Sequence, residues 1–288
     1  MSRVLVVAPL VLDDIATPQG AVHGELGGSA AYAALAARHF APTAIAAIVG
    51  ADFPLRYLDR LAGVDLSRIE RVAGASFRWV GEHRPDGTTV TLSNDPGATA
   101  GRLPALGDLR DAYVVVGALE PNLQERVGPA RFVAIDTMPC YIDDDPARLR
   151  RALAGSDAAF LTREEALRLT GSADAREIRR LLGARLLVLK AGAEGAAVIG
   201  DSWTIRVRAH QASAFDPTGA GDAFAGAFVA TLAERGGESE STLRLAARRG
   251  AAAASIAVED FGTRALERAT SEDIERRARA LERTGALA

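Results

Sequence analysis

A nine-residue stretch late in the chain combines two glycines with hydroxyl and acidic side chains: Asp216-Pro217-Thr218-Gly219-Ala220-Gly221-Asp222-Ala223-Phe224. A β-prone run at 203–209 precedes this stretch. The stretch ends in an apolar, alanine-rich segment with helical character, 223–233. We therefore predict a loop that runs into the N-terminus of a helix.

The chemistry of this loop follows from its residue types. Glycine has no Cβ, so the backbone can turn tightly and approach a ligand closely. The first N–H groups of a helix have no partner inside the helix, and the helix dipole adds partial positive charge there. Such a helix end binds anions. Asp222 beside a bound phosphoryl group could take the proton of an attacking hydroxyl. An ordinary helix start would explain a lone G-x-G-D, but the nine residues together favour catalysis.

This stretch resembles the second signature of the ribokinase-like (PfkB) family of carbohydrate and nucleoside kinases. The resemblance implies that Asp222 is the catalytic base and that the backbone of residues 219–221 holds the oxyanion of the transferring phosphate. It also implies that Thr218 contacts ATP, and that Asp216 lies near the substrate or a monovalent cation such as K⁺. Pro217 stands where the family usually has Thr, Ser or a similar residue, and proline lacks an N–H donor.

Two acidic residues, Asp13 and Asp14, follow a short apolar run at 4–8 that is typical of a buried parallel strand. Ligands collect at the carboxyl ends of strands in open α/β sheets, and a carboxylate offers two acceptor oxygens to sugar hydroxyls. A solvated turn explains the same residues equally well. The family resemblance favours Asp13, with Ile15 two positions later, as the substrate-binding residue.

A diglycine, Gly27-Gly28, leads into a helical pattern at 33–39. It resembles the first signature of the family, in which a diglycine and the following helix line the sugar site. Gly27, Gly28 and Tyr32 are therefore expected to contact the substrate. Tyr32 departs from the ribokinase pattern, which usually has Asn there; its ring could stack on a ligand or simply pack.

The residues Thr162-Arg163-Glu164-Glu165 stand where the family has Asn-x-x-Glu. Hard carboxylate oxygens suit Mg²⁺, often through bound waters, so Glu165 is the expected metal residue. A helix start with Thr162 as N-cap and Glu165 at the third helical position explains the same residues. The two interpretations are compatible.

A predicted strand at 186–190 ends in Lys190-Ala191-Gly192-Ala193-Glu194-Gly195, and a second strand is predicted at 196–199. The turn resembles the family loop that passes beside the nucleotide phosphates. Lys190, Gly192 and Gly195 are therefore expected to contact ATP, although Lys190 could be only a strand-end residue, which we slightly favour.

Composition excludes several classes of protein. The 288 residues, 48% of them hydrophobic, can bury one large α/β core. A net charge of -3 argues against a general nucleic-acid binder. Lys190 is the only lysine, and it follows Leu189 rather than glycine, so there is no Walker A loop. The single cysteine, Cys140, excludes a disulfide framework and suits a reducing cytosol. No apolar run approaches the roughly 20 residues that span a bilayer, so we expect a soluble, cytoplasmic protein.

The alternation of strands and helices predicts an α/β fold with a doubly wound, mostly parallel sheet flanked by helices. The family resemblance implies one ribokinase-like domain over 1–288 with a small β-strand lid, formed by roughly 12–26 and 72–95. Within the lid, a hairpin is predicted around Pro85-Asp86-Gly87. Exposed apolar residues such as Phe77 and Trp79 could instead form a homodimer interface.

The expected function is transfer of the γ-phosphate of ATP, with Mg²⁺, to a hydroxyl of a small sugar or polyol. A nucleoside or inositol acceptor and a non-catalytic sugar-binding member of the family are the alternatives. A dinucleotide-dependent oxidoreductase needs G-x-G-x-x-G after the first strand. This chain has Ala8-Pro9-Leu10 there, which argues against that class.

Overall fold

A computed structural model describes residues 3–285, so the ends of the predicted range 1–288 lie outside the described residues. The main sheet runs in the order β13-β12-β11-β10-β9-β8-β1-β4-β5. All its pairings from β11 to β5 are parallel, and β12 and β13 are antiparallel. Its strands are β1 (Arg3–Val7), β4 (Thr43–Gly50), β5 (Asp65–Val72), β8 (Ala112–Val116), β9 (Phe132–Asp136), β10 (Ala158–Thr162), β11 (Leu186–Lys190), β12 (Ala196–Ile199) and β13 (Thr204–Val207). The predicted mostly parallel α/β sheet is confirmed.

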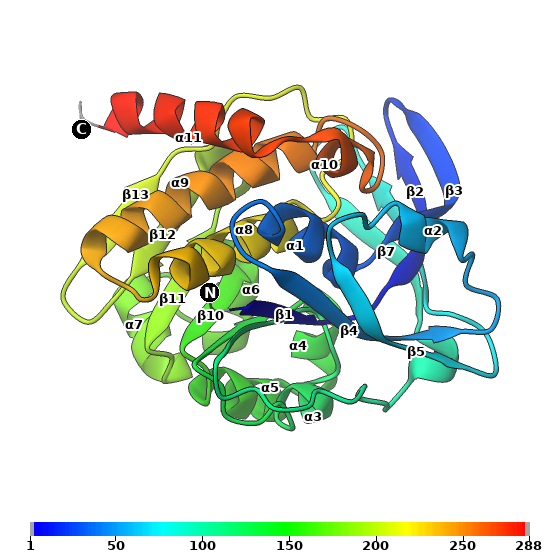
Figure 1. Ribbon diagram of the computed structural model, residues 1–288. Helices are drawn as coiled ribbons and strands as arrows, with labels where there is room; N and C mark the ends of the chain where they lie inside the picture. Colours follow the sequence, from blue (N-terminus) through cyan, green and yellow to red (C-terminus); the bar gives the residue numbers. More distant parts are fainter. Residues whose placement is uncertain (1–2, 286–288) are drawn as a thin grey trace.

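Helices cover both faces of this sheet (Figure 1). The first face packs against α1 (Ser29–Ala37), α8 (Ala220–Arg235) and α9 (Glu240–Ala257). Two further helices, α10 (Arg264–Arg268) and α11 (Ser271–Gly285), pack against α9 on the same side. The second face packs against α4 (Pro139–Asp144), α5 (Pro146–Ala154), α6 (Arg163–Thr170) and α7 (Ala175–Leu182). Four shorter elements complete the chain: α2 (Arg56–Asp59), α3 (Pro121–Gln124), η1 (Gly97–Thr99) and η2 (Gly192–Glu194). Within 3–285, every helix is too short or too polar to span a lipid bilayer.

Alternation along the strands divides the core into these two halves. In β1, Val4 and Val6 pack toward the α8 side, whereas Leu5 and Val7 pack toward the α5 side. Successive side chains of a strand point to opposite faces, and a strand buried on both faces is apolar throughout. The short apolar runs of the sequence are therefore the central strands.

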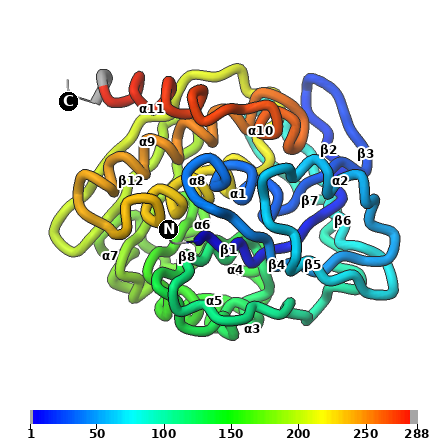
Figure 2. The backbone as a smooth tube through the Cα atoms, viewed as in Figure 1, coloured from blue at the N-terminus to red at the C-terminus, as the bar shows by residue number. Residues whose placement is uncertain are grey.

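A second, four-stranded sheet lies beside the main one, in the order β3-β2-β6-β7. Its strands are β2 (Val11–Thr17), β3 (Gly20–Gly27), β6 (Arg78–His83) and β7 (Thr89–Asp95). Two antiparallel hairpins, β2–β3 and β6–β7, are joined by the parallel pair β2–β6. The chain trace places this sheet at one end of the molecule (Figure 2). Its strands fall within or beside the two segments predicted for the lid.

The predicted exposure of the lid's aromatic residues is wrong for Phe77. Phe77 is only 6% exposed and lines a small cavity with Pro9 and Tyr141, and Trp79 is half-buried. The phenyl ring of Phe77 therefore packs inward and is not available to another molecule.

Close packing of α1 against α8 requires a glycine at position 226. A Cβ at Gly226 would overlap the backbone carbonyl of Ala33 in α1. We expect Gly226→Ala to lower the free energy of unfolding by about 1–3 kcal/mol, the usual cost of overpacking. Gly237→Ala is the matched control because a Cβ there meets nothing within 4 Å. Denaturant unfolding should show the loss for the first variant and a change below about 0.5 kcal/mol for the second. Equal effects would contradict this description of the interface.

Candidate active site

The predicted loop and helix start are present, and a left-handed glycine begins α8. Gly219 is the N-cap residue with φ 74° and ψ 0°, and the N–H of Ala223 donates to its carbonyl at 2.9 Å. A side chain at this position would be strained, and its Cβ would overlap the ring of Tyr32. The first-turn N–H groups that follow have no acceptor inside the helix. This backbone can therefore receive an anion.

Asp222 lies in the first turn of α8 and is half-buried. Burial raises the pKa of its carboxyl to about 7, and the negative charge of Asp136 contributes to the rise. The Lys190 ammonium and a hydrogen bond from Ser29 oppose this shift of the pKa. A carboxylate with a pKa near neutrality can both accept and release a proton at physiological pH.

Lys190, the only lysine of the sequence, lies next to the loop that begins α8. Lys190 Nζ donates to both oxygens of Asp136, at 2.8 and 2.7 Å. A Cβ built on Gly221 would lie 2.9 Å from Lys190 Nζ, so the ammonium group and the loop are neighbours. Burial lowers the pKa of Lys190, but Asp136 and Glu165 more than offset this and the pKa is raised overall. The group is therefore a fixed positive charge beside the anion site.

Glu165 caps α6, as one of the two interpretations of this segment predicts. Its N–H donates to Thr162 Oγ1 at 3.1 Å, and its carboxylate accepts from the N–H of Thr162 at 2.7 Å. Burial raises the pKa of Glu165, and Lys190 opposes the rise. No group of three or more acidic, His or Cys residues arranged to hold a metal ion occurs among residues 3–285.

Asp13 and the diglycine form a second part of the site. Asp13 is 3% exposed and lies within β2, the strand that follows β1, whereas the sequence indicated a position directly after the first strand. A Cβ on Gly27 would overlap its carboxylate, and a Cβ on Gly28 would overlap the carbonyl of Pro9. Burial, followed by the charge of Asp216, raises the pKa of Asp13 well above its usual value, against a hydrogen bond from the Gly28 backbone. The two glycines thus allow the chain to wrap closely around this carboxyl group.

Tyr32 lies between the two parts of the site. Its side chain is 1% exposed, and its ring packs against Gly219. Its hydroxyl is buried without a hydrogen-bond partner among the described residues. Burial and the charges of Asp13, Asp216 and Asp222 raise the pKa of Tyr32, so the phenol stays neutral. A neutral hydroxyl near three carboxyl groups can donate a hydrogen bond to a polar ligand or to water.

Asp216 holds the beginning of the loop in place. It is fully buried, and its two oxygens accept from the N–H groups of Thr218 and Gly262, each at 2.9 Å. The backbone N–H of Asp216 also donates to the carbonyl of Val258 at 3.1 Å. The carboxylate therefore ties the loop to the segment that follows α9.

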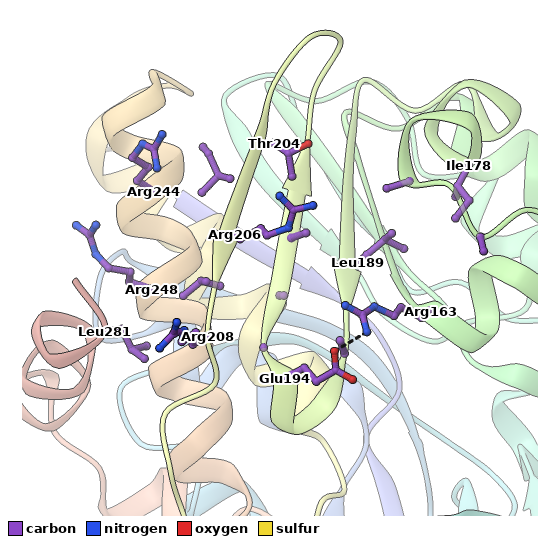
Figure 3. Close-up of a pocket in the computed structure, with 18 of the residues that line it drawn as sticks. Arg163, Ile178, Leu189, Glu194, Thr204, Arg206, Arg208, Arg244, Arg248 and Leu281 are labelled. Carbon is purple, nitrogen blue, oxygen red and sulfur yellow. Dashed lines mark hydrogen bonds and ion pairs between the residues drawn. The ribbon is translucent and has the colours of Figure 1, made fainter. Parts of the chain in front are cut away.

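A large cavity of about 1050 Å³ opens beside the turn that follows β11. It starts at Ala191, Glu194 and Gly195 and extends across β13 to α9, where arginines line it (Figure 3). One of them, Arg163, forms an ion pair with Glu194. Neither Asp222 nor Asp13 lines this cavity. The cavity therefore lies on the side of the glycine turn at 192–195, away from Asp13 and Asp222.

The structure thus brings together most of the residues that the sequence predicts. Asp222, Gly221 and Lys190 lie at the first part of the site, and Asp13, Gly28 and Tyr32 at the second. Asp136, Ser29 and His83 were not among the predicted site residues. Asp136 had a signal, because it ends a buried strand at the ligand edge of the sheet; Ser29 and His83 had none.

Comparisons with known proteins find relatives that match nearly the whole chain. The model of the pfkB family carbohydrate kinases matches residues 6–269. A cytidine kinase from Thermococcus kodakarensis is 28% identical over 266 residues, which cover 86% of this chain and 95% of that protein.

Two solved structures show the same fold. A Burkholderia thailandensis nucleoside kinase in complex with inosine has a TM-score of 0.78 at 19% identity, over 96% of this chain and 97% of that one. A Vibrio cholerae fructokinase with fructose, ADP and calcium bound has a TM-score of 0.78 at 21% identity, over 96% and 98% of the two chains. The chain is therefore a member of the pfkB family of carbohydrate kinases, which are phosphotransferases with a hydroxyl acceptor.

Proposed function

We propose that this enzyme transfers the γ-phosphoryl group of ATP to a hydroxyl of a nucleoside, with Asp222 as the base. One observation carries the proposal: a half-buried carboxyl with a pKa of about 7 lies in the first turn of α8, beside a glycine-lined backbone and the Lys190 ammonium. A base, backbone donors for the phosphoryl oxygens and a fixed positive charge each serve phosphoryl transfer to an alcohol.

The proposed step balances at named atoms. The acceptor oxygen attacks the γ-phosphorus while Asp222 takes its proton, and the bond from the γ-phosphorus to the β–γ bridging oxygen breaks to leave ADP. Negative charge spreads over the phosphoryl oxygens during this exchange. The N–H groups at 219–221 and the Lys190 ammonium stabilise that charge without reorganising, because both are fixed by packing.

The acceptor would be held at the part of the site that contains Asp13, Gly28 and Tyr32. Asp13 can accept hydrogen bonds from two neighbouring hydroxyls, and the unpartnered Tyr32 hydroxyl can donate one. The diglycine at 27–28 brings the backbone close to this position. This arrangement suits a ribose or another polyol ring.

The nucleotide would enter from the opposite side. The cavity of about 1050 Å³ has room for a base and a ribose, and it begins at the turn that contains Gly192 and Gly195. Phosphates that extend from this cavity would pass Gly195 and Lys190 toward Thr218 and the α8 N-terminus. The donor and acceptor thus approach Asp222 from two sides.

Two cations are part of the proposal. Mg²⁺ would neutralise the phosphates when it is bound, and the Glu165 carboxylate, whose oxygens are ligands of the kind that Mg²⁺ prefers, would hold it through water. A monovalent cation such as K⁺ would lie near Asp216, whose oxygens each retain a lone pair after accepting one N–H.

A nucleoside is a better candidate acceptor than the simple sugar or polyol that we expected from the sequence. The cytidine kinase relative, 28% identical, supports a nucleoside.

A panel of acceptors tests the proposal. Purified enzyme, ATP and Mg²⁺ are mixed with cytidine, uridine, adenosine, inosine, ribose, fructose or inositol, and ADP release is measured. We expect a nucleoside to give the highest kcat/KM. A sugar as the best acceptor would overturn the nucleoside assignment alone, whereas no transfer to any hydroxyl compound would overturn the proposed function.

The pKa of Asp222 predicts the pH dependence of this activity. A general base works in its deprotonated form, so kcat/KM for the acceptor should fall about tenfold per pH unit below about pH 7. A plateau should follow above about pH 7.5. Initial rates between pH 5.5 and 9 measure this profile, and constant rates between pH 5.5 and 8 would contradict the role of Asp222.

A further inference from the structure

A histidine of the lid reaches the loop that precedes α8. His83 is the last residue of β6, and its Nε2 lies 2.7 Å from Thr218 Oγ1, 135 residues away in the chain. The same nitrogen lies 3.5 Å from Asp216 Oδ1. Thr218 directly precedes Gly219, the residue whose left-handed conformation begins the anion-binding helix. The contact therefore joins the lid to the backbone that receives the phosphoryl group.

The imidazole of His83 is held from both sides. Its Nδ1 lies 2.9 Å from Thr89 Oγ1, and Thr89 is its cross-strand partner in β7. The side chain is 8% exposed. A neutral imidazole has one donor and one acceptor nitrogen, and a hydroxyl can act in either role, so both contacts are satisfied in either tautomer. Burial lowers the pKa of His83, which favours this neutral form, although Asp216 opposes the shift.

The Thr218 residue has a matching pair of contacts. Its hydroxyl meets His83, and its N–H donates to Asp216 Oδ1 at 2.9 Å. Asp216 in turn is fixed by Gly262. Without His83, the Thr218 side chain would lose its partner from the lid, and the loop would be held on one side only.

We propose that His83 is a positioning residue that fixes Thr218, and through it the anion-binding backbone at 219–221, when the lid lies over the loop. This inference rests on the proposed function of that backbone. Because acceptor and lid lie on the same side of the site, His83 would make the oxyanion site complete only when the lid is in place. Phosphoryl transfer would then depend on lid position even though no lid residue touches the phosphate.

The test compares paired variants of the two residues. His83→Leu and Thr218→Val each remove one side of the contact. His83→Gln retains a hydrogen-bonding group at about the position of Nε2. Thr91→Val is the matched control, because it removes a hydrogen bond within the lid, from Trp79 Nε1 at 3.3 Å, that does not reach the loop. Steady-state kinetics give kcat and both KM values, and thermal unfolding monitors the fold.

We expect His83→Leu to lower kcat about tenfold or more, with KM for ATP changed less than about threefold. Thr218→Val should lower kcat to a similar extent, and only kcat is compared for this variant because the ATP phosphates are expected to approach Thr218. The double variant should be no worse than either single one, because both remove the same interaction. His83→Gln and Thr91→Val should keep kcat within about threefold of the original enzyme.

Two results would overturn the inference. One is additive losses in the double variant, and the other is unchanged kcat in His83→Leu and Thr218→Val. If either occurs while Asp222→Asn still abolishes turnover, the proposed function stands and only the role of His83 is wrong. If His83→Leu does not fold, the comparison of His83→Gln with Thr218→Val decides.

Discussion

Asp222→Asn is expected to lower kcat by at least about 10²-fold, the usual scale for loss of a general base. Asparagine keeps the shape of the side chain but cannot take the proton of the acceptor hydroxyl. The backbone at 219–221 and the Lys190 ammonium remain in place, so the Kd for ATP should change less than about threefold. Steady-state rates and calorimetric titration with ATP measure these two quantities.

Stability should change in the opposite direction to activity. The folded-state pKa of Asp222, about 7, lies above its usual value of 3.8. The folded protein therefore binds this proton more tightly than the unfolded chain, and the stability so gained is present below about pH 4 and lost as the pH rises through about 7. Asp222→Asn removes the buried charge, so at pH 8 it should unfold at a higher temperature than the original protein.

A matched control separates this effect from a general effect of charge at a helix start. Glu240 occupies the first turn of α9 and pairs with Arg244 at the surface. Glu240→Gln should leave kcat unchanged within about twofold. A loss of turnover in Asp222→Asn that is accompanied by a lower unfolding temperature at pH 8 would point to a structural role for Asp222 instead.

Lys190→Met is expected to have the second largest effect, on both stability and turnover. The variant leaves the buried carboxylate of Asp136 without its partner. Breaking a buried ion pair in this way costs about 3–5 kcal/mol of folding free energy. Turnover should also fall at least about tenfold, because a positive charge beside the transferring phosphoryl group is lost. Denaturant unfolding and steady-state rates measure the two effects.

The double variant Lys190→Met/Asp136→Asn distinguishes stability from catalysis. It removes both charges of the pair, so most of the lost stability should return. Turnover should stay low, because the ammonium group is still absent. Recovery of turnover in the double variant would show that Lys190 acts only by supporting the fold.

The pH profile of Lys190→Met offers an independent check. The Lys190 ammonium lowers the pKa of Asp222. Its removal should therefore move the acidic limb of the kcat/KM profile to higher pH. An unmoved limb would contradict the electrostatic contact between the two residues.

Local patterns were enough to predict the strands, the loop and the helix cap that carry several candidate site residues. The strands β11 and β12 have the predicted bounds, because each is a short apolar run with glycine or polar residues at its ends. The loop into α8 follows in the same way from its glycines. Thr162 and Glu165 form the capping box that their spacing indicates.

Edge and surface elements were harder to predict. The strand β5 lies at the edge of the main sheet and has mostly polar residues, so its sequence has no apolar run. The segment 52–61 forms only a short helix, Arg56–Asp59. Asp52 does not cap a helix there: its carboxylate accepts hydrogen bonds from the N–H and the hydroxyl of Ser76, both at 2.7 Å.

Contacts between distant segments could not be predicted from the sequence. The ion pair of Lys190 with Asp136 spans 54 residues, and the contact of His83 with Thr218 spans 135. No spacing rule relates such residues, since only the fold brings them together. Lys190 shows the consequence: it is the strand-end residue that we favoured, and it also lies beneath the anion-binding loop.

The most direct test of the central claim is phosphoryl transfer by the original enzyme and Asp222→Asn, measured side by side at pH 8 with ATP, Mg²⁺ and the best acceptor. Mass spectrometry follows the phosphorylated acceptor and ADP in the same samples. We expect equal amounts of both products from the original enzyme and a rate at least about 10²-fold lower for the variant. Transfer by Asp222→Asn within a few-fold of the original rate would contradict this claim.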